Sequence, residues 1–266
     1  MKARRFAVIG DPIAQSKSPA MHRAAFRALG LPHTYEAVRV TASELPRIVQ
    51  ALREGYYDGL NVTVPHKVAA LALADEAAAP GMTAANTLVR TDDGRIVAHN
   101  TDAPALAEEL RLLAGPVAPW ASRRALVLGS GGAALSAVAA LRQLGVVDVV
   151  VRARTPRADA TQPWQPSRAS EARSLAVVQA TSAGMIGADA GDPVAAVVAW
   201  EALPPDAVAL DVVYAPPDTP FLLAARTRGL RHAGGLGMLA RQGALAFELW
   251  LGVPAPFAVM RAALDT

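Results

Sequence analysis

The segment RALVLGSGGAALSAVAALRQLG, residues 124–145, limits the possible folds of this chain more than any other part of the sequence. It begins as an apolar run typical of a buried strand, turns at Gly129, and continues with the small and apolar residues of a helix. A strand that leads through a glycine turn into a helix is part of a βαβ unit, and such units build parallel sheets covered by helices. The segment therefore predicts an α/β protein.

The rest of the chain repeats this alternation. Apolar or alternating runs predict strands, and segments of helical period predict the helices between them. The expected strands are 5–10, 34–40, 58–64, 146–155, 174–182 and 206–214, with an antiparallel hairpin over 86–100 that turns at Asp92–Gly94. The expected helices are 18–30, 41–55, a short one after Pro65, 102–113, 132–145, 218–229 and 236–251, and Ser18 is expected to be the N-cap of the first.

Length and charge exclude several classes of protein. The chain has 266 residues, which favours two domains. It has no cysteine, which excludes disulfide and thiolate chemistry. The formal charge of +3 and the scattered basic residues argue against nucleic acid or an anionic membrane as partner. The apolar run before Gly10 is too short for a signal segment and no stretch is long enough to span a membrane, so we expect a cytoplasmic protein.

The glycine turn carries a nucleotide-binding pattern. Gly129, Gly131 and Ala134 fit G-x-G-x-x-G/A, in which the second glycine lets the backbone approach a pyrophosphate and the third position stays small for helix–strand packing. The helix N-terminus offers N–H groups and a positive dipole end to the phosphates. A tight turn with no ligand is the alternative, but the strand before it and the helix after it favour dinucleotide binding.

The end of the next strand distinguishes NADP from NAD. An NAD site needs an acidic residue there for the ribose hydroxyl, but Asp148 stands at the start of that strand. Arg152, Arg154 and Arg157 follow instead, together with Thr155, and arginine can bond two phosphate oxygens at once. An arginine-rich loop in an arginine-rich chain is the alternative. The missing acid favours NADP.

Polar residues also interrupt apolar runs in the first part of the chain, and one of them is a rare lysine. Of the 26 Lys and Arg residues only Lys2, Lys17 and Lys67 are lysines, and a lysine can transfer a proton at a pH where an arginine cannot. Each polar residue can be explained singly as a cap or a satisfied side chain. Together they predict a pocket for a small, hydroxyl-rich molecule; they stand in the segments SKS (16–18), NVTVPHK (61–67), AANTLV (84–89) and NTD (100–102).

Nine ordered segments resemble the signatures of shikimate dehydrogenases and together span essentially the whole chain. They are GDPIAQSKSPAMH, GLNVTVPHK, AANTLV, NTD, GSGGAA, ART, QATSAGM, DVVY and GGLGMLARQGALAFELWLG. The resemblance implies NADPH-dependent, reversible reduction of 3-dehydroshikimate to shikimate, a step in chorismate and aromatic amino acid biosynthesis. It also implies a substrate-binding and catalytic domain of residues 1–101 plus 237–266 and a Rossmann-like NADP-binding domain of residues 102–236, with the C-terminal helices returning to the first domain.

The resemblance further implies roles for individual residues. Lys67 and Asp102 would be the catalytic pair, with the lysine moving the proton. The substrate carboxylate and ring hydroxyls would be bound by Ser16, Ser18, Asn61, Thr63, Asn86, Asp102, Tyr214 and Gln242. The cofactor would be bound by Gly129, Ser130, Gly131, Gly132, Ala133, Arg154, Thr155, Arg157, Thr181, Val213, Gly235 and Met238.

The sequence departs from the family at three positions. Ala153 replaces the usual asparagine before Arg154, and Gln179 stands where the family often has asparagine. The stretch from Thr155 to the next strand is short, which indicates that a helix or strand is missing from that flank. No pair of histidines has the spacing of a metal site with a carboxylate partner, so we expect surface or packing roles for the histidines and no metal.

Two alternative functions stay open. A quinate or dual quinate/shikimate dehydrogenase shares these signatures but would favour an acid for NAD. An NADPH-binding regulatory protein would have the fold without the chemistry, and the presence of Lys67 and Asp102 argues against it. The expected partner is a small-molecule substrate, and the expected assembly is a monomer or homodimer.

Overall fold

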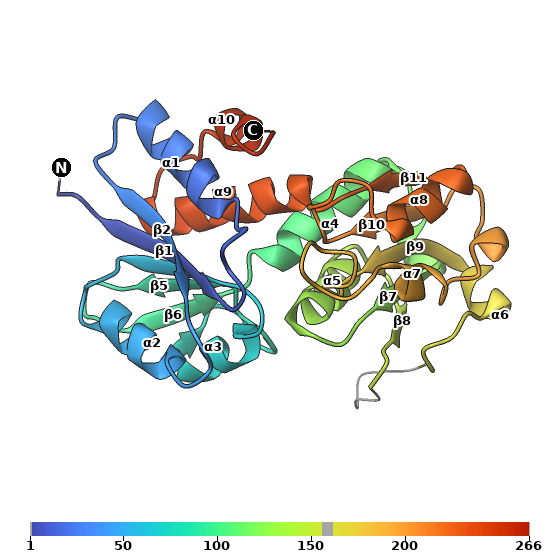
Figure 1. The fold of residues 1–266 in the computed structure, drawn as a ribbon, viewed down its shortest axis with the longest axis horizontal. Coiled ribbons are helices and arrows are strands. Elements are labelled where there is room, and N and C mark those ends of the chain that lie inside the picture. The colour runs from blue at the N-terminus through green and yellow to red at the C-terminus, as the bar shows by residue number, and fades with distance from the viewer. Residues whose placement is uncertain (1, 156–161, 266) are drawn as a thin grey trace. The chain divides into compact units, whose positions relative to one another are not determined.

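The computed structural model describes residues 2–155 and 162–265, and the chain divides into two compact units (Figure 1). Unit 1 consists of Met1–Thr101 and Leu239–Thr266, and unit 2 of Asp102–Met238. The chain passes from unit 1 to unit 2 after Thr101 and returns to unit 1 within helix α9, after Met238. The sequence analysis places this return two residues earlier, after residue 236.

In the described part of unit 1, six strands form a mixed sheet in the order β2-β1-β3-β5-β6-β4. β1 pairs in parallel with β2 and β3, whereas β5 pairs antiparallel with β3 and β6. The expected hairpin is therefore confirmed as β5–β6. The strands are β1 (Arg5–Gly10), β2 (Thr34–Arg39), β3 (Gly59–Val62), β4 (Glu76–Ala77), β5 (Thr87–Arg90) and β6 (Ile96–His99); the helices are α1 (Ser18–Ala28), α2 (Leu45–Arg53), α3 (Lys67–Leu73), α9 (Leu236–Leu251) and α10 (Phe257–Ala262).

The alternation along β1 explains how this sheet is covered on both faces. Ala7 and Ile9 pack in a core with residues of α2 and α3, including Leu52 and Ala70. Phe6 points to the other face, where its ring lies 4.9 Å from that of Trp250 on α9. Helices therefore lie on both sides of the sheet, α2 and α3 on one and α1, α9 and α10 on the other (Figure 1).

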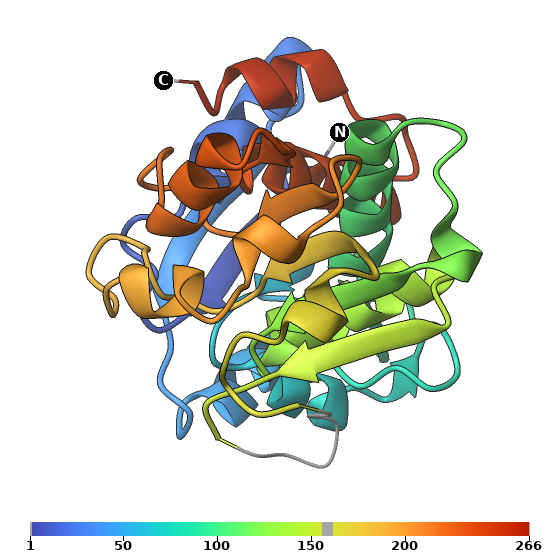
Figure 2. The same ribbon diagram turned by 90° about the vertical axis from the view of Figure 1, so that its right-hand side faces the viewer.

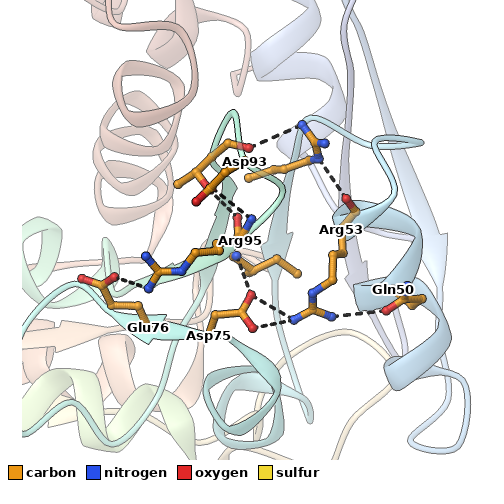
Figure 3. A network of polar contacts seen from close by, with 9 residues as sticks. Gln50, Arg53, Asp75, Glu76, Asp93 and Arg95 are labelled. Carbon is orange, nitrogen blue, oxygen red and sulfur yellow. Dashed lines mark hydrogen bonds and ion pairs between the residues drawn. The ribbon is translucent and has the colours of Figure 1, made fainter.

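A polar network ties the β5–β6 hairpin to α2 at the surface of unit 1 (Figure 3). The guanidinium of Arg53, at the end of α2, donates to both carboxylate oxygens of Asp75 at 3.0 Å, and Gln50 accepts from the same guanidinium. Asp75 also accepts from the Ile96 backbone N–H at 2.8 Å. The hydrogen bonds from Ile96 and Arg53 hold the pKa of Asp75 below its usual value. One carboxylate thus joins a helix end to a strand.

Unit 2 holds a parallel sheet of five strands in the order β11-β10-β9-β7-β8, counted over its described residues. Figure 2 faces this unit, with β8 in yellow-green at one edge of the sheet. The strands are β7 (Arg124–Leu128), β8 (Asp148–Arg152), β9 (Ser174–Gln179), β10 (Val208–Asp211) and β11 (Arg231–Ala233); the helices are α4 (Asp102–Ala114), α5 (Gly132–Gln143), α6 (Arg168–Glu171), α7 (Asp192–Ala195) and α8 (Pro220–Thr227), with single 3-10 turns at Trp120–Ser122 and Trp200–Ala202.

Both faces of this sheet are buried, as its continuous apolar strands predict. Val127 on β7 packs with Leu106 of α4 and Leu141 of α5. Leu126, its neighbour in sequence, packs on the opposite face with Phe221 of α8. This is the doubly wound α/β arrangement, so the predicted fold class is confirmed.

The edge beyond β8 differs from the usual dinucleotide-binding sheet. Numbered within unit 2, the strand order is 2-1-3-4-5, without a third strand beyond the second. Between β8 and β9 the described residues, 153–155 and 162–173, contain the short helix α6 and a single parallel bridge between Arg152 and Gln162. This agrees with the short flank noted in the sequence.

Two local predictions are wrong. Ser18 does not cap α1, because the helix begins at Ser18 itself and Lys17 precedes it. The expected strands are also too long: that at 146–155 covers only Asp148–Arg152, and that at 206–214 only Val208–Asp211. Within the described ranges, no helix combines the length and the apolar character that a membrane crossing requires.

Candidate functional site

Three residues predicted to bind substrate share one buried hydrogen-bond network in unit 1. The side-chain oxygen of Asn86 accepts from the Thr101 backbone N–H at 2.7 Å, and its amide donates to Gln242 Oε1 at 3.3 Å. Asn61 on β3 donates to the Asn86 carbonyl at 3.3 Å and to Thr87 Oγ1 at 3.0 Å. Asn61 and Asn86 are buried. Because buried amides must be bonded, the network fixes which way each of them points.

Tyr35 joins this network and was missed by the sequence analysis. Its ring is fully buried on β2, and its hydroxyl donates to Asn61 Oδ1 at 2.6 Å. Burial raises the pKa of Tyr35 well above its usual range, against a smaller lowering by its hydrogen bond with the Ser18 side chain. Tyr35 therefore stays a neutral donor and links Ser18 to Asn61. A lone tyrosine on the buried face of a strand was the available signal, since a buried hydroxyl needs a partner.

His22 packs behind this tyrosine. The two rings are stacked, with centroids 4.2 Å apart and planes 7° apart. Burial lowers the pKa of His22 to about 3, so the imidazole is neutral at physiological pH. Neither of its ring nitrogens has a hydrogen-bond partner among the described residues. Of the surface or packing roles expected for the histidines, His22 therefore has a packing role.

Replacing Tyr35 by phenylalanine is expected to lower the free energy of unfolding by about 1–3 kcal/mol, because Asn61 Oδ1 loses its donor in a buried place. Urea denaturation followed by circular dichroism measures this change. The control is Tyr56→Phe, since the side chain of Tyr56 is exposed, and this variant should unfold like wild type. Equal stability of the two variants would show that the Tyr35 hydroxyl does not support the network.

The remaining residues expected to bind the substrate lie at the ends of elements. Ser16 Oγ accepts from the Ser18 backbone N–H at 3.3 Å. The hydroxyl that bonds a backbone N–H at the start of α1 is therefore that of Ser16 and not that of Ser18. Thr63 follows the last residue of β3 and is half-buried, whereas the sequence analysis places it on the strand beside Asn61. Both hydroxyls border the turn regions from which α1 and α3 start.

The proposed catalytic pair occupies the first positions of two helices. Lys67 begins α3, is half-buried, and its carbonyl accepts from the Ala85 N–H at 2.9 Å. Asp102 begins α4 and is buried. Lys67 belongs to unit 1 and Asp102 to unit 2, directly after the residue at which the chain leaves unit 1.

In unit 2 the glycine turn has the shape that the motif predicts. Gly129 has φ +119°, and a Cβ there would lie 3.0 Å from the Ala180 carbonyl oxygen, so both its conformation and its surroundings require glycine. Gly131 is exposed, and a Cβ on it would meet nothing within 4 Å. Gly132 begins α5, with no side-chain cap before it. Ala134 is buried in the core, as the third position of the motif requires.

The turn stands where the strand order of the sheet reverses, the place at which such sheets bind ligands. β7 lies between β8 and β9, and Gly129 and Thr181 follow the ends of β7 and β9. A Cβ on Gly129 would lie 3.0 Å from Thr181 Cγ2, so the two predicted cofactor residues are neighbours. Gln179 was noted only as a departure from the family, but its side chain organises the segment after β9 by accepting from the Thr181 N–H and donating to the Ala183 carbonyl.

The arginines expected at the 2′-phosphate do not form one cluster. Arg152 is wrong as a phosphate residue, because its guanidinium is fully buried and pairs with Glu171 at 2.9 Å. Arg154 and Thr155 are exposed, and Arg154 pairs with Asp189 at 3.1 Å. Arg157 lies outside the described residues.

Two more residues expected to bind the cofactor, Val213 and Gly235, lie between β10 and α9. Asp211 accepts from the Val213 N–H at 2.9 Å, and the Val213 carbonyl accepts from the Gly235 N–H at 3.0 Å. A Cβ on Gly235 would lie 2.2 Å from the Val212 carbonyl oxygen. Burial raises the pKa of Asp211 to about 6. Tyr214 is half-buried beside this pair, whereas Met238 packs in the core of unit 2.

The geometry fits a phosphate-bearing cofactor. Open space above Gly131, an uncapped helix start and an exposed guanidinium at Arg154 are what a pyrophosphate and a further phosphate require. Residues 2–155 and 162–265 contain no group of three or more His, Asp or Glu side chains that could hold a metal ion. Fold and sites together define an α/β protein of the dinucleotide-binding class, with a separate unit that carries a buried amide network.

Comparisons with known proteins give the family. Residues 8–88 match the profile of the shikimate dehydrogenase substrate binding domain, and residues 235–264 match that of the shikimate 5'-dehydrogenase C-terminal domain. The NADP-dependent shikimate dehydrogenase of Methylobacterium radiotolerans is 41% identical over 261 residues, which cover 92% of this chain and 90% of that protein. The chain belongs to the shikimate dehydrogenase family, so the resemblance read from the motifs is confirmed.

Solved structures agree. Shikimate 5-dehydrogenase of Thermus thermophilus, in complex with NADP(H) and shikimate, has a TM-score of 0.82 at 37% identity, with 98% of each chain covered. The ligand-free 5-ketofructose reductase of Gluconobacter sp. strain CHM43 has a TM-score of 0.83 at 28% identity, with 100% of this chain and 99% of that one covered. The fold is thus shared by reductases that are named for different substrates.

Proposed function

We propose that this chain catalyses the NADP-dependent, reversible reduction of 3-dehydroshikimate to shikimate. The observation that carries the proposal is the buried network in which the Asn61 amide donates to the Asn86 backbone carbonyl and the Asn86 amide donates to Gln242. A set of oriented amides suits a ligand with several hydroxyl groups. The names of the relatives that match over nine-tenths of the chain support the same activity.

The substrate would be held by residues of the polar segments together with Tyr214 and Gln242. Ser16 and Ser18 would donate hydroxyl hydrogen bonds to the carboxylate, with Tyr214 as a third donor. Asn61, Thr63, Asn86, Asp102 and Gln242 would bond the ring hydroxyls. Tyr35 would act indirectly, because it bonds both Ser18 and Asn61 and so keeps carboxylate and hydroxyl contacts in register.

Lys67 and Asp102 would handle the proton. NADPH, when bound, supplies the hydride that reduces the substrate carbonyl carbon. The carbonyl oxygen must then gain a proton, and the Lys67 ammonium would donate it; in the reverse direction the lysine amine would take the proton from the hydroxyl. Asp102 would bond the ammonium and the same hydroxyl and so keep donor and acceptor aligned.

On the cofactor side, the backbone of Gly129, Ser130, Gly131, Gly132 and Ala133 would bond the pyrophosphate. Arg154 and Thr155, with Arg157, would bond the 2′-phosphate. Thr181, Val213, Gly235 and Met238 would face the nicotinamide end, and the paired backbone groups of Val213 and Gly235 would give that end a fixed wall. Unit 1 would then be the substrate-binding domain and unit 2 the NADP-binding domain.

The cellular setting is a further part of this proposal. Aromatic amino acid and chorismate biosynthesis as the pathway, and the cytoplasm as the location, rest on the family resemblance. A monomer or a homodimer is the assembly we propose.

Two other substrates have a specific reason to be considered. Quinate differs from shikimate only near the ring atom that bears the carboxylate, so the same amides could bind it. The 5-ketofructose reductase shares the fold at 28% identity, and its name implies another polyhydroxylated ketone as substrate.

The test is the absorbance change at the nicotinamide band during oxidation of shikimate and of quinate, each with NADP and with NAD, and during reduction of 5-ketofructose with NADPH. We expect fast turnover only with shikimate and NADP. Comparable rates with quinate or 5-ketofructose would move the chain to that substrate. A folded sample that binds NADPH but turns over none of these substrates would contradict the proposed activity.

A further inference from the structure

A fully buried carboxyl group lies at the end of β10, where the chain leaves the parallel sheet of unit 2. It belongs to Asp211, the last residue of the strand. Burial raises the pKa of Asp211 to about 6, against the opposing effects of its hydrogen bonds with Thr219 and Val213. Since the ordinary value is 3.8, stability is lost as pH rises from about 4 to about 6, and the cost is fully present above that. A group retained at such a cost calls for a reason other than stability.

The two oxygens of this carboxylate join three parts of unit 2. Oδ1 accepts from the Val213 backbone N–H at 2.9 Å, directly after the strand. Oδ2 accepts from the Thr219 hydroxyl at 2.6 Å, and that hydroxyl accepts from the Leu222 N–H in the first turn of α8. The carboxylate therefore holds the turn at 212–213 against both the end of β10 and the start of α8.

The same turn contacts the segment that leads into α9. The Val213 carbonyl accepts from the Gly235 N–H at 3.0 Å. A Cβ on Gly235 would overlap with the Val212 carbonyl oxygen, so the two backbones lie as close as a glycine allows. Val213 is itself buried. A displacement of the turn would therefore be transmitted directly to Gly235.

We infer that Asp211 positions the backbone of Val213 and Gly235 against the nicotinamide ring of NADP(H). This inference rests on the cofactor assignment of the proposed function, in which these two residues face the nicotinamide end. Asp211 is a positioning residue, because both of its oxygens are bonded to protein atoms and its side chain is buried. The pyrophosphate and the 2′-phosphate are assigned to other residues, so their binding should not depend on Asp211.

The test compares NADPH with 2′-phospho-ADP-ribose, which has the same phosphates and adenosine but lacks the nicotinamide. Isothermal titration calorimetry gives Kd for both compounds, and the ratio of the two values reports the contacts of the nicotinamide alone. Asp211→Ala removes both acceptor oxygens. It is expected to raise Kd for NADPH by about tenfold, the effect of one lost hydrogen bond, and to leave Kd for 2′-phospho-ADP-ribose unchanged.

Two further variants separate positioning from a general loss of stability. Asp211→Asn keeps an oxygen that can accept from the Val213 N–H, so it should restore most of the NADPH affinity. Ser174→Ala removes a buried hydroxyl that donates to the Ser170 carbonyl at 3.0 Å, at the start of β9. This control should leave both Kd values unchanged even where it lowers the thermal unfolding midpoint as much as Asp211→Ala does.

A second route to the same carboxylate keeps the inference testable if Asp211→Ala does not fold. Thr219→Val deletes the donor to Oδ2 with little change in side-chain size, and it should also weaken NADPH alone. Thr219→Ser, which keeps the hydroxyl, should bind like wild type. Thr227→Val is the matched control, because Thr227 is exposed on the same helix and its hydroxyl donates only to the Leu223 carbonyl.

The outcomes distinguish the inference from the proposed function. An equal loss of affinity for both compounds, or unchanged NADPH affinity in Asp211→Ala and Thr219→Val, would overturn the inference. Wild-type protein that binds 2′-phospho-ADP-ribose as tightly as NADPH would refute the assignment of Val213 and Gly235 to the nicotinamide, and with it the role of Asp211. The expected Kd values in a protein that oxidises no shikimate would support the inference and contradict the proposed function alone.

Discussion

Lys67→Ala is expected to lower kcat by about 10²–10⁴-fold, the usual contribution of a positioned general acid or base. Binding of shikimate and NADPH should change little, because the amides of Asn61, Asn86 and Gln242 are oriented by bonds to one another and to their neighbours on the sheet. The fold should also tolerate the change, since Lys67 is only half-buried and the bond from the Ala85 N–H goes to its backbone carbonyl. Steady-state kinetics and calorimetric titration separate the two effects.

Two further variants test whether Lys67 acts as the proton donor. Lys67→Arg keeps the positive charge but holds its proton, so it should not restore turnover. Lys2→Ala removes an exposed lysine that lies before β1 and should behave like wild type. A Lys67→Ala protein with wild-type kcat would mean that another group moves the proton. Turnover restored by Lys67→Arg would point to a purely electrostatic role.

The order of strands and helices could be predicted because each unit repeats short, strongly patterned segments. Helix α9 was expected at 236–251 and lies at Leu236–Leu251, since a long apolar helix with no internal proline has few alternatives. The hairpin β5–β6 followed from its Asp-Asp-Gly turn. Strand ends were predicted less well, because apolar residues also stand outside the paired segment, as Val146 and Val147 do before β8.

The contacts within the site depended on residues far apart in sequence. Asn86 and Gln242 are 156 positions apart, and only the resemblance to a family put both in one pocket before the structure joined them. The hydrogen-bond partners of Tyr35 could not be predicted from the sequence of β2 alone. Ser18 looked like a cap because serine before Pro19 is common there, but its hydrogen bond with Tyr35 is a tertiary contact.

Arg152 shows why composition can mislead. In a chain with so many arginines, an arginine after a strand is indistinguishable in sequence from one that faces solvent. Its partner Glu171 lies 19 positions away on α6, a helix of four residues that no periodicity could reveal. The assignment of Arg152 to a phosphate therefore failed for a physical reason: its guanidinium is buried and paired with the Glu171 carboxylate.

Glu171→Ala is expected to lower the free energy of unfolding by about 3–5 kcal/mol, because it leaves the buried guanidinium of Arg152 without its counter-charge. The carboxylate also accepts from the backbone N–H groups of Ala199 at 3.1 Å and Ser167 at 3.2 Å, and both would lose this acceptor. The loss would be a large share of the stability of an ordinary domain. Urea denaturation of the full chain measures it.

A surface ion pair in the same unit is the matched control. Glu201 pairs with Arg168 at 2.6 Å, but the two side chains are 61% and 74% exposed. Glu201→Ala should therefore cost less than about 1 kcal/mol. Replacing both members of the buried pair, Arg152→Met with Glu171→Leu, should recover much of the loss, because no charge then remains buried.

The pH dependence gives an independent check on the buried carboxylate. Burial alone would raise the pKa of Glu171, but its hydrogen bond with Arg152 and the two backbone N–H groups outweigh burial, and the pKa lies below the ordinary value of 4.5. A lowered pKa means that the ionised form stabilises the fold above pH 4.5, and that this contribution is lost as pH falls through the folded-state pKa. The stability gap between wild type and Glu171→Gln should therefore be constant from about pH 7 to about pH 5 and narrow below that. A stability difference between wild type and Glu171→Gln that stays the same at about pH 3 would show that the Glu171 carboxylate does not hold the Arg152 guanidinium as an ion pair. A Glu171→Ala variant no less stable than Glu201→Ala would show the same.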